Sequence, residues 1–154
     1  DARTDSAVHG HRLARPDDHG WISRVVDGWW GRPIAGSLPR LFLDHFWSTS
    51  TVVEDGGRPV AFLVGFLSPS QPGQAYIHFV GVDPEHRSAG LGRDLYERFF
   101  TTARELGATE VSAVTSPVNT GSIAFHRAMG FDVSDPIDDY DRPGPALVHF
   151  HRTL

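Results

Sequence analysis

The 154-residue chain contains no cysteine and no lysine. Without a thiol, these residues cannot form a disulfide, a thiolate metal site or an acyl-cysteine intermediate. Without lysine, Schiff-base chemistry, covalent pyridoxal phosphate and the P-loop lysine are excluded, since all fourteen basic residues are arginine. Covalent nucleophilic catalysis would therefore need a serine, threonine, histidine or carboxylate.

Positive charge and long apolar runs are also scarce. The net charge is −5 and there is no basic stripe, so we expect no nucleic-acid partner. No apolar run approaches the ~20 residues of a membrane span, and the first residues lack the apolar core of a signal peptide. We therefore expect a cytoplasmic protein without a membrane partner. With 40% apolar and 21% charged residues, residues 1–154 read as one globular domain whose core begins near residue 8.

The predicted elements follow the order strand, two helices, three strands, helix, strand, helix and two strands. The first strand is Val8–Leu13, and the helices near Gly20–Trp30 and Leu38–Trp47 carry all four tryptophans. These aromatics either pack the helical pair together or line a substrate pocket. The later elements are the hairpin Thr51–Glu54 and Arg58–Leu67 across Asp55-Gly56-Gly57, the strand Gln74–Val82, the helix Gly90–Leu106, the strand Glu110–Thr115, the helix Asn119–Met129, and the strands Phe131–Val133 and Ala146–Arg152.

This order predicts an α/β fold with a mixed, mostly antiparallel central sheet flanked by helices. The long helix between the strands Gln74–Val82 and Glu110–Thr115 predicts a parallel, right-handed crossover between them. Gly130 follows the helix Asn119–Met129 at the place where a C-terminal cap is expected.

The most informative segment is Tyr76–Phe100, which reads YIHFVGVDPEHRSAGLGRDLYERFF. A strand runs into the small-residue turn Arg87–Gly92, and an amphipathic helix follows. Free backbone N–H groups and the positive dipole end at a helix start can hold a phosphate or pyrophosphate. Alone, the motif is equally typical of a structural turn. A dinucleotide fingerprint would need a third glycine where Leu95 stands, and a P-loop would need a lysine.

A second motif, NTGSIAFHRAMGF at Asn119–Phe131, lies one strand downstream. Together with VGVDPEHRSAGLG, it closely resembles the two signature motifs of GNAT-family N-acetyltransferases. That family pattern is a strand with V-x-P, R/Q-x-x-G-x-G/A, a helix, a strand and N-x-x-A/S-x-x-x-Y-x-x-x-G-F. The resemblance in element order covers nearly the whole chain and is weakest near its beginning.

The resemblance implies a single-domain GNAT-like fold with splayed parallel strands, and transfer of an acetyl group from acetyl-CoA to an amine. The absence of cysteine favours direct attack in a ternary complex over a ping-pong route. The backbone amides of Ser88–Arg93 would hold the CoA pyrophosphate. The main chain of Val80 and Val82 would pair with the pantetheine arm as with an added strand. Asn119 would contact the cofactor, act as a helix N-cap, or do both. The residues implied for CoA are Val80, Gly81, Val82, Arg87, Ser88, Ala89, Gly90, Leu91, Gly92, Arg93, Asn119, Ser122 and His126.

The candidate base is His78. An alkylammonium with a pKa near ~10 must lose its proton before it can attack a thioester. Family members often carry a catalytic Glu or His at the positions that match Tyr76 and His78, and strand alternation predicts that these two share one sheet face with Val80 and Val82. Glu54, on an adjoining strand, is a lesser candidate.

The candidate acid is His126, which stands where the family motif has tyrosine. It either protonates the departing thiolate or serves as a hydrogen-bonding wall residue. In the second case the thiolate leaves unassisted, which a thiol pKa near ~8.5 permits. A backbone N–H around Val80 is the family-like donor to the oxyanion.

The remaining histidines suggest weaker sites. His9 and His11 alternate on the first strand, as do His149 and His151 on the last, and such pairs can bind zinc. Solvated strand faces explain these pairs better, so we expect no metal. His86 lies in the turn, where it touches phosphate or is simply exposed.

The acceptor amine is the least defined partner. Five aspartates between Asp132 and Asp141 form either a negative rim that attracts a cationic small molecule or peptide, or a solvated acidic loop. Two other functions remain open: a non-catalytic acyl-CoA sensor, suggested by the missing motif tyrosine, and a protein-binding domain that uses the tryptophan-rich helices. Family members often dimerise, so a homodimer is a further expectation.

Overall fold

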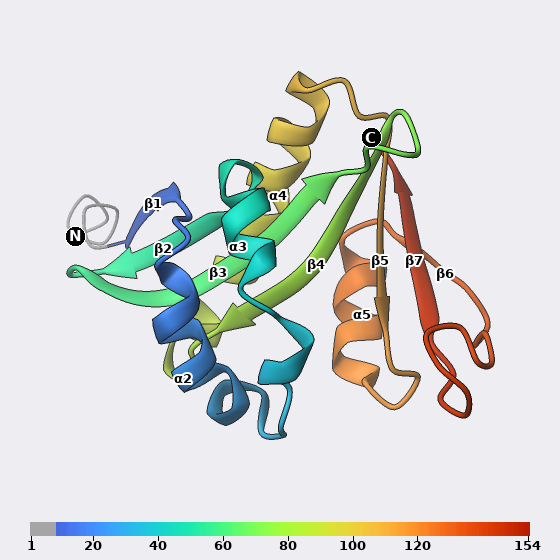
Figure 1. Ribbon diagram of the computed structural model, residues 1–154, viewed down its shortest axis with the longest axis horizontal. Helices are drawn as coiled ribbons and strands as arrows, with labels where there is room; N and C mark the ends of the chain where they lie inside the picture. Colours follow the sequence, from blue (N-terminus) through green and yellow to red (C-terminus); the bar gives the residue numbers. More distant parts are fainter. Residues whose placement is uncertain (1–8) are drawn as a thin grey trace.

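The computed structural model describes residues 9–154, and a seven-stranded sheet forms the centre of this part of the chain (Figure 1). The strand order is β1-β2-β3-β4-β5-β7-β6. Neighbouring strands are antiparallel except for β4 and β5, which are parallel, as the crossover predicted. The strands are β1 (His9–Leu13), β2 (Thr51–Asp55), β3 (Arg58–Leu67), β4 (Gln74–Val82), β5 (Glu110–Thr115), β6 (Asp132–Val133) and β7 (Val148–Thr153).

Helices cover both faces of the sheet. The helices α4 and α5 pack on one face, and α2 and α3 pack on the other. Short 3-10 helices connect these elements. The helices are α2 (Asp18–Trp30), η1 (Ala35–Ser37), α3 (Leu41–Phe46), η2 (Trp47–Thr49), η3 (Pro84–Ala89), α4 (Leu91–Glu105) and α5 (Thr120–Ala128). The expected α/β class and element order are confirmed, while Val8, the predicted first residue of β1, lies outside the described residues.

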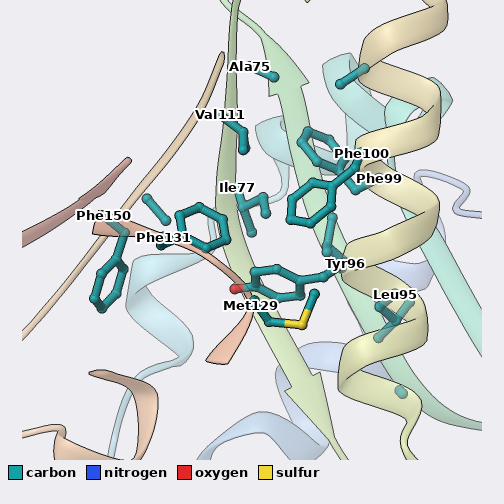
Figure 2. Close-up of a cluster of buried hydrophobic side chains, with 14 of the residues drawn as sticks. Ala75, Ile77, Leu95, Tyr96, Phe99, Phe100, Val111, Met129, Phe131 and Phe150 are labelled. Carbon is teal, nitrogen blue, oxygen red and sulfur yellow. The ribbon is translucent and has the colours of Figure 1, made fainter. Parts of the chain in front are cut away.

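The larger core lies between the sheet and α4. Apolar residues at helical spacing on α4 face the sheet, because only one stripe of an amphipathic helix can be buried. Figure 2 shows Tyr96, Phe99 and Phe100 reaching from α4 toward β4, Phe131 and Phe150. The buried residues of α4 are Leu91, Leu95, Tyr96, Phe99, Phe100 and Ala103.

Glycine punctuates the elements where the backbone turns left-handed. Gly56 and Gly57 close the β2–β3 hairpin with φ of 57° and 84°, values that favour glycine because it has no Cβ. Gly130 follows α5 with φ 86°, so the predicted C-terminal cap is confirmed.

The strands β4 and β5 separate soon after they begin. In the described chain their pairing covers only Gln74–Tyr76 with Glu110–Ser112. Beyond these pairs the two strands diverge, as Figure 1 shows. The C-terminal half of β4, from Ile77 to Val82, therefore has a sheet partner on its β3 side and an open edge toward β5.

A bulge interrupts β4 at the start of this open half. The β3–β4 register shifts between Val64, which pairs with Phe79, and Gly65, which pairs with Ile77, so His78 is an extra residue on β4. Such a bulge bends the strand and redirects its side chains. No helix within residues 9–154 combines the length and the apolar character needed to cross a bilayer.

Candidate functional site

The open edge of β4 presents main-chain groups toward β5. The Asp83 N–H donates to the Val60 carbonyl oxygen over 2.8 Å, so Asp83 faces β3. Main-chain groups alternate between the two edges of a strand. The N–H and C=O of Val82 and Val80 therefore face the space between the diverging strands, as an added strand would require.

Trp30, the last residue of α2, already contacts this edge. Its indole Nε1–H donates to the Val80 carbonyl oxygen over 3.2 Å, and its ring packs on Phe79 with a centroid distance of 5.2 Å. The preceding residue, Trp29, accepts a hydrogen bond from Arg87 through its carbonyl oxygen. The C-terminus of α2 is thus attached both to the open edge of β4 and to the glycine-containing turn.

The N-terminus of α4 follows directly after η3. Gly90, the N-cap residue, has φ 75° and provides no side-chain cap, so among the described residues no side chain caps the first amides of α4. A Cβ at Gly90 would have no atom within 4 Å, which leaves the turn open on its outer side. Free amides at a helix start attract anions, so the geometry suits a phosphate at Leu91–Arg93.

A hydrogen bond and an ion pair hold this turn against the β2–β3 hairpin. His86 Nε2 lies 2.9 Å from Asp55 Oδ2, and Arg58 lies 3.3 Å from Asp83 Oδ2. The Asp83 carboxylate also accepts the Glu85 N–H over 3.0 Å. The sequence left open whether His86 touches phosphate or is simply exposed. In the structure, its contact with Asp55 supports the turn.

The two arginines of the turn have their side chains occupied. Arg87 donates to Trp29, whereas Arg93 lies 3.9 Å from Glu97 on the same helix and lines a surface hollow with Gly130 and Arg152. At Arg93, the backbone amide and not the side chain is therefore the group that lies at the start of α4.

The second motif begins with a helix cap. The Asn119 side chain accepts the Ser122 N–H over 3.2 Å and donates to Thr115 Oγ1 over 3.3 Å. The N-cap interpretation of Asn119 is confirmed. A cofactor contact by Asn119 or Ser122 stays a prediction.

His126 is buried against the core with both ring nitrogens engaged. Its Nδ1 lies 2.8 Å from the Ser122 carbonyl oxygen, and its Nε2 lies 2.8 Å from the Tyr96 hydroxyl. Because a carbonyl only accepts, Nδ1 carries the proton and Nε2 accepts from Tyr96. The ring also stacks on Phe150 at 3.9 Å.

Burial lowers the pKa of His126, although the bond to Ser122 partly opposes this shift. A neutral ring without a free proton is unsuited to donate to a leaving thiolate near neutral pH. The geometry therefore favours the second alternative, in which His126 is a hydrogen-bonding wall residue and not the acid.

His78 has a different environment on the α3 side of the sheet. Its Nε2 lies 2.8 Å from the Ser37 carbonyl oxygen in η1, and its ring stacks on Phe42 at 3.9 Å. The carbonyl again fixes the tautomer, so Nδ1 of the neutral ring carries the lone pair. Within residues 9–154, no hydrogen bond of Nδ1 is found. Burial lowers the pKa of His78, which keeps this lone pair available near neutral pH.

The predicted alternation along β4 is wrong across the bulge. Ile77 joins the core under α4, whereas Phe79 joins the cluster under α2, although they are two residues apart. Val80 and Val82 pack on the α4 side, opposite to His78. The extra residue at position 78 reverses the alternation, so His78, the candidate base, and the valines expected to pair with pantetheine present their side chains to opposite faces.

Comparison with known proteins shows the family to which this chain belongs. Residues 11–131 match the model of the acetyltransferase (GNAT) family. This chain belongs to the GNAT family. An L-2,4-diaminobutyric acid acetyltransferase of Nocardia farcinica is 33% identical over 89 residues, which cover 58% of this chain and 46% of that protein. The chain therefore spans about half the length of this curated relative.

Solved GNAT structures share the fold. Ard1 from Thermoplasma volcanium matches with a TM-score of 0.81 at 20% identity, covering 96% of this chain and 98% of that chain. Diaminobutyrate acetyltransferase EctA from Paenibacillus lautus, in complex with L-2,4-diaminobutyric acid and coenzyme A, matches with a TM-score of 0.69 at 18% identity. That match covers 92% of this chain and 93% of that chain. At such identities the likeness establishes the fold.

Other histidine and carboxylate candidates do not join the site. The strands β1 and β7 are separated by four strands in the described sheet, so the two histidine pairs lie far apart. Residues 9–154 hold no group of three or more His, Cys, Asp or Glu side chains placed for a metal ion. Glu54 lies 3.4 Å from Arg12 at the β1 side of the sheet, two strands from β4.

The structure also adds residues that the sequence did not assign. Trp30 contacts the edge of β4, and the carbonyl of Ser37 fixes the tautomer of His78. Trp30 belonged to the aromatic set expected either in the core or at a pocket; its ring packs against the core cluster under α2, and a place at a substrate pocket stays a prediction. A backbone carbonyl such as that of Ser37 has no sequence signal.

Proposed function

We propose that this GNAT-family chain transfers an acetyl group from acetyl-CoA to a primary amine by direct attack in a ternary complex. One observation supports this proposal most: the open edge of β4 is continuous with the uncapped start of α4. Along one path, the open edge offers hydrogen-bonding groups to an amide-rich arm, and the helix start offers amides to a pyrophosphate. The coenzyme A in the complex of Paenibacillus lautus EctA supports the same donor.

The donor is proposed to lie along the diverging strands. The Val80 and Val82 main chain would pair with the pantetheine arm, and the amides of Leu91–Arg93 would hold the pyrophosphate. Bound there, acetyl-CoA supplies the acetyl group as an activated thioester. The proposed donor residues are Val80, Gly81, Val82, Arg87, Ser88, Ala89, Gly90, Leu91, Gly92, Arg93, Asn119 and Ser122.

Some of these residues act through the backbone alone. A Cβ at Gly81 would lie 2.5 Å from the Phe62 ring, so Gly81 is needed for packing behind the open edge. Gly92 is less crowded, since a Cβ there would lie 3.7 Å from Phe125. Larger side chains at Gly90 or Gly92 would therefore project into the space proposed for the donor.

His78 is the proposed base. Its Nδ1 accepts the proton of the incoming ammonium, directly or through one water, while Ser37 keeps Nε2 protonated. The Val80 N–H, on the open edge, is the proposed donor to the reacting carbonyl oxygen. With His126 buried and neutral, the thiolate leaves without an acid, which its pKa near ~8.5 permits.

The proposed acceptor is a small amine with cationic character. The relative from Nocardia farcinica is named for L-2,4-diaminobutyric acid, a compact diamine. The aspartate-rich segment between β6 and β7 would attract such a cation. A basic peptide is the other acceptor that the same charge would favour.

Thiol release from acetyl-CoA, measured across a panel of amines and basic peptides, tests this function. Release that requires an amine is the expected result. CoA binding without release for any amine would instead favour a non-catalytic acyl-CoA sensor. That second function is favoured by one observation, the enclosed His126 at the position of the family's tyrosine.

A further inference from the structure

His149 on β7 has a buried ring nitrogen without a partner. Its Nε2 is shielded from solvent, and among the described residues no group bonds to it. The ring is met edge-on by Tyr140, with centroids 4.2 Å apart and an interplanar angle of 88°. A buried polar atom without a partner costs stability, so such an atom calls for a functional explanation.

The sheet places His149 on the same face as His78. Its neighbours Val148 and Phe150 point into the core under α4 and α5, so His149 points to the opposite face. His78 also lies on that opposite face, where it stacks on Phe42 of α3.

The registers place the two histidines at the same level. The last β4–β5 pair joins Tyr76 and Ser112. Two residues further along each strand stand His78 and Val114, and Val114 pairs with His149 on β7. The side chains of His78 on β4 and His149 on β7 therefore lie on the same face of the sheet, with β5 between these two strands.

The segment between β6 and β7 brings charge to this place. Burial, followed by the nearby Tyr140 and the negative charge of Asp141, raises the pKa of Tyr76 to about 12. Tyr140 lies against His149, and Asp141 follows it within electrostatic range of Tyr76 on β4. Asp139 shapes the segment, since its carboxylate accepts the Gly144 N–H over 2.6 Å.

We infer that His149, with Tyr140 and Asp141, recognises a second amino group on the acceptor, so that the acceptor is a compact diamine. This inference rests on the proposed function. One amino group meets His78 and reacts. The other, protonated, donates to His149 Nε2 and is attracted by the Asp141 carboxylate. A monoamine of equal length would leave Nε2 unpaired.

The test measures binding to the enzyme saturated with CoA, which cannot react. Isothermal titration compares putrescine with butylamine, which has the same carbon chain and one amino group. We expect putrescine to bind about tenfold tighter or more, as one hydrogen bond to a charged group implies. His149→Phe keeps a ring against Tyr140 but removes the nitrogen, and it should abolish the preference.

His151→Phe is the matched control, because His151 lies on the same strand and face but pairs with Glu110 at 3.3 Å. This variant should keep the preference for putrescine. Equal affinities of the two amines for the wild type, or an unchanged preference in His149→Phe, would overturn the inference. Failure of CoA itself to bind is a separate result, which would overturn the proposed function together with this inference.

Discussion

The indole N–H of Trp30 donates to the Val80 carbonyl oxygen over 3.2 Å. This carbonyl lies on the open edge of β4, where the donor arm is proposed to pair. Trp30 therefore stands where part of the donor would bind, and it joins that edge to the end of α2. The segment after α2 carries Ser37, whose carbonyl fixes the tautomer of His78. The proposed donor binding at β4 and the proposed orientation of the base thus involve one continuous stretch of chain.

Trp30→Phe should tighten CoA binding. Phenylalanine keeps a ring against Phe79 but cannot donate to Val80, so the arm no longer competes for that carbonyl. One lost neutral hydrogen bond predicts a gain of roughly two- to tenfold, measured by isothermal titration with CoA. Trp47→Phe, in an exposed tryptophan of η2, should leave the affinity unchanged. Weaker binding by Trp30→Phe would show that the indole assists the donor.

Gly90→Leu should prevent CoA binding while the protein remains folded. The new side chain would stand at the start of α4, over the amides proposed to hold pyrophosphate. Gly107→Leu is the matched control, because Gly107 also has a left-handed φ, of 91°, and open space around it, but lies beyond the far end of α4. Both variants should lose about 1 kcal/mol of stability from backbone strain. Equal CoA affinity in the two variants would exclude a phosphate site at this turn.

Replacing His78 should slow acetylation most near neutral pH, where the ring is neutral and the amine is still protonated. Burial lowers the pKa of His78, so in the wild type the acid limb of kcat/KM should lie below the usual histidine value of 6.5. Below this limb the ring is protonated and cannot accept the amine proton. His78→Phe keeps the stack on Phe42 and should reduce kcat/KM by about a hundredfold or more. A wild-type pH profile in this variant would exclude His78 as the base.

His126 should influence stability and not the chemical step. His126→Phe leaves the Tyr96 hydroxyl without its partner and should cost roughly 1–3 kcal/mol in the free energy of unfolding. The double variant with Tyr96→Phe should recover part of this loss, because both polar groups are then gone. A large fall in kcat with normal CoA affinity would restore His126 as the acid.

The same residue predicts a pH dependence of stability. Burial lowers the pKa of folded His126, whereas the unfolded chain keeps a value near ~6.5. As pH falls below that unfolded value, the unfolded state takes up protons first, so the free energy of unfolding should fall. His78 acts in the same direction. In His126→Phe, the free energy of unfolding should change less between about pH 7 and about pH 5 than it does in the wild type. An unchanged pH dependence would contradict this assignment.

Local patterns predicted the elements that hold the site. The bounds of β3, β4 and β5 agree with the sequence, because a continuous apolar run in β3, alternation in β4 and β5 and the flanking turns mark them clearly. The glycines before α4 and after α5 were equally readable. The helix expected over Leu38–Trp47 is divided into α3 and η2, with Leu38, Pro39 and Arg40 before the start of α3. Proline and the clustered aromatics make that region less regular than its apolar content suggested.

The relationships between elements were less predictable. The bulge at His78 depends on the β3–β4 register, so the alternation predicted for His78 and Val80 failed. The enclosure of His126 follows from Tyr96 and Phe150, which lie on other elements. The placement of His149 and His78 on one face, on either side of β5, requires the order β4-β5-β7, which local sequence does not carry.

The most direct measurement is the amine-dependent release of thiol from acetyl-CoA, with the acetylated amine identified by mass spectrometry. Because the chain has no lysine, acetylation of its own side-chain amines cannot mimic the product. We predict release that is stoichiometric with acetylated putrescine in the wild type, and strongly reduced release in His78→Phe with CoA affinity preserved. Firm CoA binding without any acetylated amine would contradict the proposed acetyl transfer.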